Sequence, residues 1–141
     1  MRFWDTSALV PLLVAEPTSS RVRAWLREDP GVIVWTLTRV ELLSALARRR
    51  RSDPRAAGHL RTARGELLDA WERWTEITAA EVVRRHAERL VETHPLRAAD
   101  ALQLGAAIVA AEEHPAMLEF VTLDDEQAAA AEREGFRVLT A

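Results

Sequence analysis

Short apolar runs alternate along the chain with longer segments whose apolar residues recur every three or four positions. The runs are rich in β-branched and aromatic residues and are bounded by turn residues, which is typical of strands buried on both faces of a parallel sheet. We expect five strands, the third being the weakest: Phe3–Trp4, Val32–Trp35, Thr75–Ile77, Glu119–Leu123 and Phe136–Leu139.

The segments between these runs carry the spacing of helices, and hydroxyl residues or prolines mark where they begin. The expected helices run from Thr6 or Ser7 through Leu13, from Thr18–Ser20 past Leu26, from Thr36 or Thr38 into the arginines that follow, from Ser52–Pro54 to about Trp74, over Ala79–Glu92, over Leu96–Glu113 and over Asp125–Glu134. In the third of these helices we expect Val40, Leu43 and either Leu46 or Ala47 to face inward.

Strands that alternate with helices imply a three-layer α/β/α sandwich around a central, mostly parallel sheet of about five strands. The chain has 141 residues, which is the size of one domain, and we place that domain at residues 1–141. In such sheets, functional sites form beyond the carboxyl ends of the strands, where the strand order reverses.

Four acidic residues fall at that edge of the predicted sheet. Asp5 ends the first strand and Asp124 the fourth, while Glu41 and Asp100 lie in early turns of helices. Asp100 interrupts an otherwise apolar helix, where an unpaired buried carboxylate is costly. Gln103 and Leu104 lie one turn further on, on the same face as Asp100.

Each acid also has a purely structural interpretation. Asp5 and either Asp124 or Asp125 can cap a helix. Asp100 can interact favourably with the dipole at the helix N-terminus and pair with Arg97. Glu41 can pair with Arg39 or Arg48 on an exposed face of its helix. These interpretations do not predict that all four acids share one edge of the sheet, whereas a functional site does.

Four carboxylates placed close together repel one another, so either some are protonated or divalent cations neutralise them. A site made only of oxygen ligands suits hard ions such as Mg²⁺ or Mn²⁺. The four histidines show no zinc-ligand spacing, and we expect them at the surface or at helix ends. An ion held by carboxylates can activate water and stabilise charge on a phosphate, which makes a phosphodiester the natural substrate.

The composition removes several other classes of protein. All 19 basic residues are arginine, which excludes mechanisms that depend on a catalytic or phosphate-binding lysine. No cysteine is present, so there is neither a disulfide nor a thiolate site. No apolar stretch is long enough to span a bilayer, and Asp5 interrupts the opening residues where a signal peptide would be apolar. We therefore expect no membrane partner and a cytoplasmic location.

Charge is unevenly distributed along the chain. Arg48–Arg64 contains seven arginines and one acid, and Glu112–Glu134 contains eight acids and one arginine. Such asymmetry is compatible with two solvated helix faces, and also with a flank that binds a polyanion beside an acidic pocket.

Four segments together resemble a known family. Trp4–Leu9, Thr38–Leu46, Leu96–Leu104 and Val121–Asp124, the last followed by Ala128–Ala131 and Gly135-Phe136, are similar in order and spacing to the motifs of PIN-domain proteins, specifically VapC-type toxin ribonucleases of type II toxin–antitoxin pairs. The resemblance covers essentially the whole chain. Gly105 departs from the alanine usual in this helix, and we expect it to permit close packing.

The resemblance implies a Mg²⁺- or Mn²⁺-dependent endoribonuclease whose catalytic acids are Asp5, Glu41, Asp100 and Asp124. Asp5 and Asp100 would hold the metal, and the other two acids would complete the pocket. The implied supporting residues are Thr6, Ser7 and Thr122. The basic segment, and in it Arg48, Arg49, Arg50 and Arg51, would contact the RNA backbone.

The implied partners are an RNA substrate, a cognate antitoxin protein whose C-terminal segment covers the active site, and a second copy of the chain in a homodimer. Two other functions compete. A PIN-like module without catalytic activity would use the acids to bind a basic segment of a partner. An aspartyl-phosphate phosphatase would use Asp5 as nucleophile, but Ser7 stands where its second acid belongs and the lysine is missing.

Overall fold

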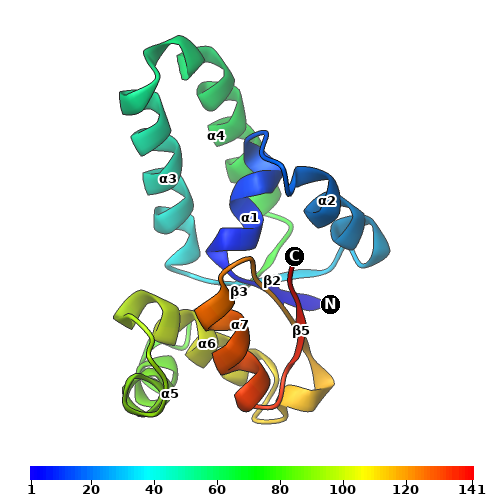
Figure 1. Ribbon diagram of the computed structural model, residues 1–141, viewed down its shortest axis with the longest axis vertical. Coiled ribbons are helices and arrows are strands. Elements are labelled where there is room, and N and C mark those ends of the chain that lie inside the picture. Colours follow the sequence, from blue (N-terminus) through cyan, green and yellow to red (C-terminus); the bar gives the residue numbers. More distant parts are fainter.

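Five parallel strands form the centre of the protein, in the order β3-β2-β1-β4-β5 (Figure 1). They are seen in a computed structural model that describes residues 1–141. The strands are β1 (Arg2–Trp4), β2 (Val32–Trp35), β3 (Thr75–Ile77), β4 (Glu119–Val121) and β5 (Arg137–Leu139). All five predicted strands are therefore confirmed, and the sheet is parallel throughout.

Seven α-helices connect the strands, together with the 3₁₀ turns η1 (Pro54–Ala56) and η2 (Pro115–Met117). The helices are α1 (Thr6–Leu13), α2 (Ser19–Glu28), α3 (Thr38–Ser52), α4 (Ala57–Trp71), α5 (Ala80–Thr93), α6 (Ala98–Ala110) and α7 (Asp125–Arg133). None of them is both long and apolar enough to cross a membrane.

Two hydrophobic clusters pack on opposite faces of the sheet, which confirms the three-layer arrangement (Figure 1). Trp4 points into the cluster formed by α1 to α4, whereas its neighbour Phe3 points into the cluster formed by α5 to α7. In β2, Val34 and Trp35 divide in the same way. Because successive strand residues face opposite sides, burial on both faces explains why these strands are apolar without alternation.

Helices α3 and α4 form an antiparallel hairpin that projects from the sheet as an arm (Figure 1). Thr38, Leu42 and Leu46 are the buried residues of α3. The expectation that Val40 faces inward is wrong, because the spacing of these three residues turns Val40 outward and leaves it 59% exposed. The expectation holds for Leu46, which is buried, and for Leu43, which is half-buried and packs against the same cluster while lining a groove between α3 and α4.

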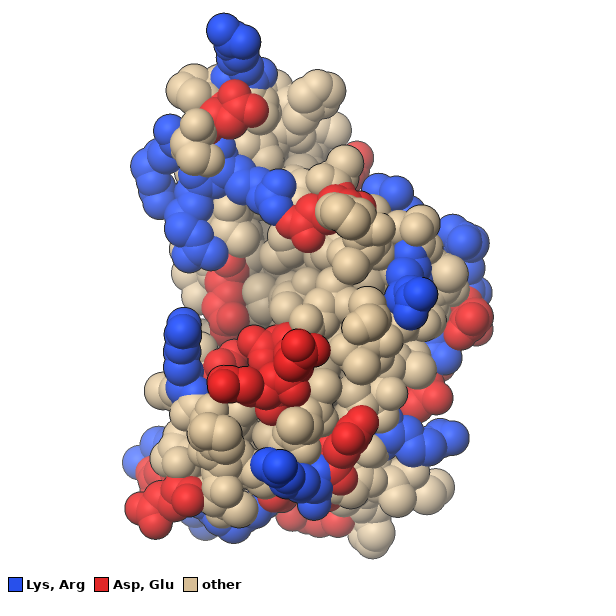
Figure 2. Space-filling view, in the orientation of Figure 1, with Lys and Arg blue, Asp and Glu red and all other residues tan.

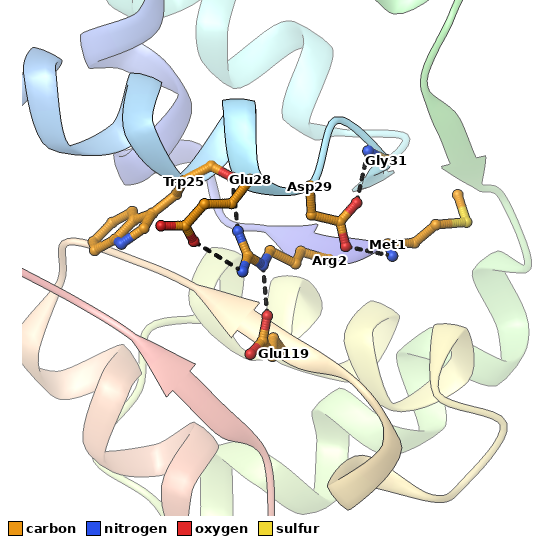
Figure 3. A network of polar contacts seen from close by, with 7 residues as sticks. All are labelled: Met1, Arg2, Trp25, Glu28, Asp29, Gly31 and Glu119. Atoms are coloured by element: carbon orange, nitrogen blue, oxygen red, sulfur yellow. Dashed lines mark hydrogen bonds and ion pairs between the residues drawn. The ribbon is translucent and has the colours of Figure 1, made fainter.

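Hydrogen bonds connect the first residues of β1 and β4 at the amino ends of the strands, on the opposite side of the sheet from the acids' end (Figure 3). Arg2 is 8% exposed, and its Nε donates to Glu119 Oε2 over 2.5 Å. The same guanidinium donates to the carbonyl oxygen of Trp25 over 2.7 Å and to Glu28 Oε2 over 3.3 Å, both from α2. A buried arginine needs such partners, and these contacts fix α2 against the central strands.

The strand order reverses between β1 and β4. The chain leaves β1 toward β2 and β3 on one side, and returns to β4 and β5 on the other. Helices that follow these strands diverge at such a point and leave a crevice beyond the carboxyl ends of the strands. Asp5 and Thr122 are the first residues after β1 and β4, so both border this crevice.

Candidate active site

Asp5 follows β1 directly, at the point where the strand order reverses, and is 4% exposed. It occupies the N-cap position of α1, but its side chain makes no capping hydrogen bond. Its Oδ2 instead accepts hydrogen bonds from Ser7 Oγ (2.6 Å) and Thr122 Oγ1 (2.9 Å). The predicted capping roles of Thr6 and Ser7 are therefore wrong: both lie inside the first turn of α1 and their hydroxyls serve acidic side chains.

The segment after β4 closes the crevice on one side. Thr122 is fully buried, and its Oγ1 accepts a hydrogen bond from the backbone N–H of Asp124 over 3.1 Å. Ser7 Oγ accepts one from the N–H of Leu123 over 2.9 Å. Asp124 is the N-cap of α7, and its Oδ1 accepts from the N–H of Gln127 over 2.9 Å. The capping interpretation of Asp124 thus holds while its side chain also borders the other acids.

Glu41 enters from the first turn of α3. Thr6 Oγ1 donates to Glu41 Oε2 over 3.0 Å, and Gln103 Nε2 donates to Glu41 Oε1 over 3.3 Å. The same amide nitrogen lies 2.8 Å from Thr6 Oγ1 and 2.8 Å from Thr38 Oγ1. Glu41 makes no ion pair with Arg39 or Arg48, so its structural interpretation fails.

Asp100 enters from the first turn of α6, whose N-cap is Arg97. Its backbone carbonyl accepts a hydrogen bond from Gln127 Nε2 over 2.9 Å, which ties α6 to α7. Asp100 forms no ion pair with Arg97 within 4.0 Å, although the positive charge of Arg97 lowers the pKa of Asp100 to some extent.

The acids interact electrostatically. Burial raises the pKa of Asp5 above its ordinary value against the hydrogen bonds from Ser7 and Thr122, and the charge of Asp124 raises it further. Burial also raises the pKa of Glu41, and the charges of Asp5 and Asp100 add to the effect. The pKa of Asp100 is raised first by burial and then by the charges of Asp5 and Asp124. All four predicted acids therefore lie in one electrostatic cluster.

Figure 2 shows a patch of acidic side chains near the middle of one face of the molecule, beside the start of α7. Glu126 belongs to the surroundings of this cluster, since its charge raises the pKa of Asp100. The sequence did not single out Glu126, because nothing in the pattern of an exposed helix start distinguishes it from its neighbours. Asp125, the alternative to Asp124, is exposed and makes no side-chain hydrogen bond or ion pair.

The donor set of the cluster fits a hard divalent cation. Its metal-ligating groups are carboxylate and hydroxyl oxygens, and the pKa values of three of the carboxyls are raised first by burial and then by the charges of neighbouring acids. As the side chains stand, no three His, Asp or Glu residues lie close enough to bind one ion together.

The four neighbouring arginines differ in their surroundings. Arg48 follows Glu41 by seven residues, which places it on the same side of α3, and its Nη1 lies 3.5 Å from Ser44 Oγ. Arg49 forms an ion pair with Glu16. Arg50 lines the groove between α3 and α4 with Arg61 and Arg64. Figure 2 shows basic side chains along this arm, above the acidic patch.

Neither a cavity beside α1 nor any histidine belongs to the cluster of acids. A cavity of about 720 Å³ lies between α1, α3 and α4, away from the acids, and Leu13, Val14 and Leu60 contribute to its lining. His94 is the C-cap of α5, as expected of a histidine at a helix end; it is buried, and its Nε2 lies 2.7 Å from Glu134 Oε2. No histidine takes part in a metal-binding group.

Comparisons with known proteins agree with this geometry. The PIN domain family model matches residues 2–133. Ribonuclease VapC45 of Mycobacterium tuberculosis (strain CDC 1551 / Oshkosh) is 30% identical over 106 residues, which cover 75% of this chain and 74% of that protein. Ribonuclease VapC49 of strain ATCC 25618 / H37Rv matches to the same extent.

Solved structures share the fold. The crystal structure of PAE2754 from Pyrobaculum aerophilum superposes with a TM-score of 0.60 at 21% identity, over 99% of this chain and 89% of that one. FitAcB from Neisseria gonorrhoeae superposes with a TM-score of 0.61 at 20% identity, over 99% and 96%. The chain belongs to the PIN domain family, as one of its VapC-type ribonucleases.

Proposed function

We propose that this protein is a divalent-cation-dependent endoribonuclease that acts as the toxin of a toxin–antitoxin pair. One observation supports the proposal above all others. Asp5, Glu41, Asp100 and Asp124 come from four separate segments, and Asp5 and Asp100 interact electrostatically with each other, with Glu41 and with Asp124 near the carboxyl ends of β1 and β4. A cluster of this charge is costly in the absence of a cation, and its relatives carry the name ribonuclease.

Asp5 and Asp100 are the residues that would hold the cation, which we propose to be Mg²⁺ or Mn²⁺. A bound ion of this kind supplies water activation and offsets charge on the phosphate under attack. Asp5 is suited to this role because Ser7 and Thr122 both donate to Oδ2, which orients the carboxylate. Glu41 and Asp124 would complete the pocket and orient water or substrate, each fixed by donors from the chain itself.

The arm would hold the RNA backbone. Arg48 is the best placed of the four arginines, because it shares a side of α3 with Glu41 and has no carboxylate partner. Arg49 would contribute less, since Glu16 already neutralises it. Arg50 and Arg51 also lack ion-pair partners, but Arg50 faces a different side of the arm. Such contacts supply affinity and not sequence preference.

Two protein partners belong to the proposal. The first is an antitoxin with a segment that covers the acids; the cavity between α1, α3 and α4 lies away from the acids and offers Leu13 and Leu60 to another part of that protein. The second is another copy of the chain. The exposed apolar side chains of Leu37 (43%) and Val40 (59%) at the start of α3 support a homodimer, which a molar mass measured by light scattering checks.

The test is cleavage of RNA by the purified protein with Mg²⁺, with Mn²⁺ and with EDTA. We expect cleavage only with a cation, and a loss of at least about 1000-fold in Asp5→Asn or Asp100→Asn, because a metal contributes several kcal/mol to such a step. Glu92→Gln, an exposed acid on α5, is the control and keeps full activity.

Full activity in Asp5→Asn and Asp100→Asn would contradict the assignment of these residues. Tight binding of a basic partner segment without any cleavage, whichever cation is supplied, would favour the non-catalytic module instead.

A further inference from the structure

Gln103 lies one turn after Asp100 on α6 and is 1% exposed. Its side-chain nitrogen is within hydrogen-bond distance of three oxygens, which come from two other helices. These are Thr6 Oγ1 of α1 (2.8 Å), and Thr38 Oγ1 (2.8 Å) and Glu41 Oε1 (3.3 Å) of α3. One buried amide therefore connects the three helices that surround Glu41.

The amide also decides where the proton of Thr6 points. An amide nitrogen only donates, so Thr6 Oγ1 accepts the hydrogen bond from Gln103. The hydroxyl proton of Thr6 is then directed to Glu41 Oε2, 3.0 Å away. Thr6 thus donates to Glu41 Oε2, and Glu41 Oε1 lies 3.3 Å from the amide nitrogen, whose two N–H groups are shared among three oxygens. These contacts restrict the rotation of the carboxylate.

The other atom of the amide is left without a partner. Gln103 Oε1 is buried and makes no hydrogen bond, which destabilises the fold relative to an apolar side chain of the same shape. Leucine would avoid this cost but would leave Thr6, Thr38 and Glu41 without the amide donor. The reverse orientation of the amide would place Gln103 Oε1 against Glu41 Oε1. In the observed orientation the amide nitrogen faces this carboxylate oxygen as a donor.

A neutral donor suits this place better than a charged one. Arginine or lysine at position 103 would pair with Glu41 and remove the negative charge that a cation requires. Glutamine orients Glu41 and leaves the charge of the cluster unchanged.

We propose that Gln103 is a positioning residue for RNA cleavage, which holds the Glu41 carboxylate toward Asp5 and Asp100 both directly and through Thr6. The predicted effect on RNA cleavage rests on the proposed function, whereas the predicted effect on the orientation of the Glu41 carboxylate does not. Gln103 does not contact the reacting phosphate in this assignment; it acts through Glu41.

The first test is a double-mutant cycle with Gln103→Leu and Glu41→Ala, measured as single-turnover cleavage of one RNA with Mn²⁺. We expect Gln103→Leu to lower the rate at saturating enzyme by about 10- to 100-fold, the usual effect of removing a hydrogen-bond partner of a metal-site carboxylate, with little change in KM. In the Glu41→Ala background the same substitution should have no further effect.

Gln127→Leu is the matched control, because Gln127 is also buried with an unpartnered Oε1 but contacts Asp100 and not Glu41. Its effect should persist in the Glu41→Ala background. Gln103→Glu, which keeps the shape and loses the donor when ionised, should be as impaired as Gln103→Leu.

A crystal structure of Gln103→Leu provides a readout that does not depend on activity. We expect an unchanged backbone with the Glu41 carboxylate turned away from its present position. If Glu41 keeps its position, or if Gln103→Leu is equally harmful with and without Glu41, Gln103 has no positioning role. If the wild-type protein cleaves no RNA, the proposed function fails, and the crystal structure still decides this inference.

Discussion

At the scale of single residues, the acids are placed where they oppose folding. Burial raises the pKa of Asp5, Glu41 and Asp100, and mutual repulsion adds to the effect in each case. A carboxyl group whose pKa is higher in the folded than in the unfolded chain favours folding below its unfolded pKa. That contribution disappears as the pH rises through the folded pKa. At neutral pH without a cation, these three residues therefore lower stability in favour of function.

Asp100→Asn should consequently stabilise the metal-free protein at pH 7. Asparagine keeps the shape of the side chain and removes a charge that Asp5 and Asp124 repel. We expect a gain of about 0.5–2 kcal/mol in the free energy of unfolding, measured by urea denaturation in EDTA. Glu92→Gln, an exposed residue of α5, should leave the value unchanged.

The gain should shrink as the pH falls. Asp100 becomes protonated in the folded wild-type protein below its raised pKa, and below its ordinary value of 3.8 it is protonated in both states. The lowered pKa values of Asp29 and Glu134 make acid destabilising, but equally in both proteins. A difference that stays constant or grows between pH 7 and pH 4 would show that charge is not its source.

At the scale of elements, the sequence predicts which helices and strands exist and their order, but not which face of a helix packs against the core. The helix predicted over Leu96–Glu113 is observed as α6, Ala98–Ala110. It ends earlier than predicted because Glu112 and Glu113 adopt positive φ angles. The sequence does not indicate such angles, since they are uncommon for glutamate. Apolar periodicity alone could not decide which side of α3 faces the sheet, and so misplaced Val40.

The same limit applies to the site. The positions of Asp5, Glu41 and Asp124 followed from parallel strands, since the carboxyl ends of β1, β2 and β4 lie at the same end of the sheet. Asp100 lies on α6, which follows α5 and not a strand, so its position depends on how these two helices pack. The roles of Thr6, Ser7 and Gln103 did not follow, because they depend on rotamers and on contacts between helices distant in sequence. A serine or threonine after a strand looks identical in sequence whether its hydroxyl caps a helix or donates a hydrogen bond to a carboxylate.

The packing of α5 against α6 depends on Gly105. A Cβ at this position would lie 2.9 Å from the carbonyl oxygen of Val83 and 3.4 Å from the backbone nitrogen of Ala87, so the backbone of one helix would have to move. The expected close packing at Gly105 is thus present. Gly105→Ala should destabilise the protein by about 1–3 kcal/mol, despite a gain in helix propensity of roughly 1 kcal/mol.

Gly65→Ala in α4 is the matched control for this prediction, because nothing lies within 4 Å of the added Cβ. There the gain in propensity should stand alone, as a stabilisation of about 0.5–1 kcal/mol. Thermal unfolding of both variants compares the two. Equal shifts in the two variants would mean that α5 and α6 separate at no cost.

At the scale of the whole molecule, charge is divided between two regions of one face (Figure 2). The sheet order brings the acids to the crevice between β1 and β4, and the α3–α4 hairpin carries the arginines above it. The net charge of −3 hides this division. A polyanion approaching this face meets attraction along the arm and repulsion at the acids, unless a cation is bound there.

RNA binding should therefore depend on salt, and on the arginines that share a side with the acids. Binding is measured in the Asp5→Asn background, in which the RNA is not cleaved. We expect Arg48→Gln to weaken binding of a single-stranded RNA and to reduce the slope of log affinity against log salt by about 0.7, the value for one lost phosphate contact. Arg49→Gln should change the slope less, because Glu16 already pairs with Arg49. Arg23→Gln on α2, exposed and without an ion-pair partner, controls for the loss of one positive charge anywhere on the surface. If Arg23→Gln and Arg48→Gln reduce the slope equally, the arm attracts RNA only through overall charge, and the arginines on it make no specific phosphate contact.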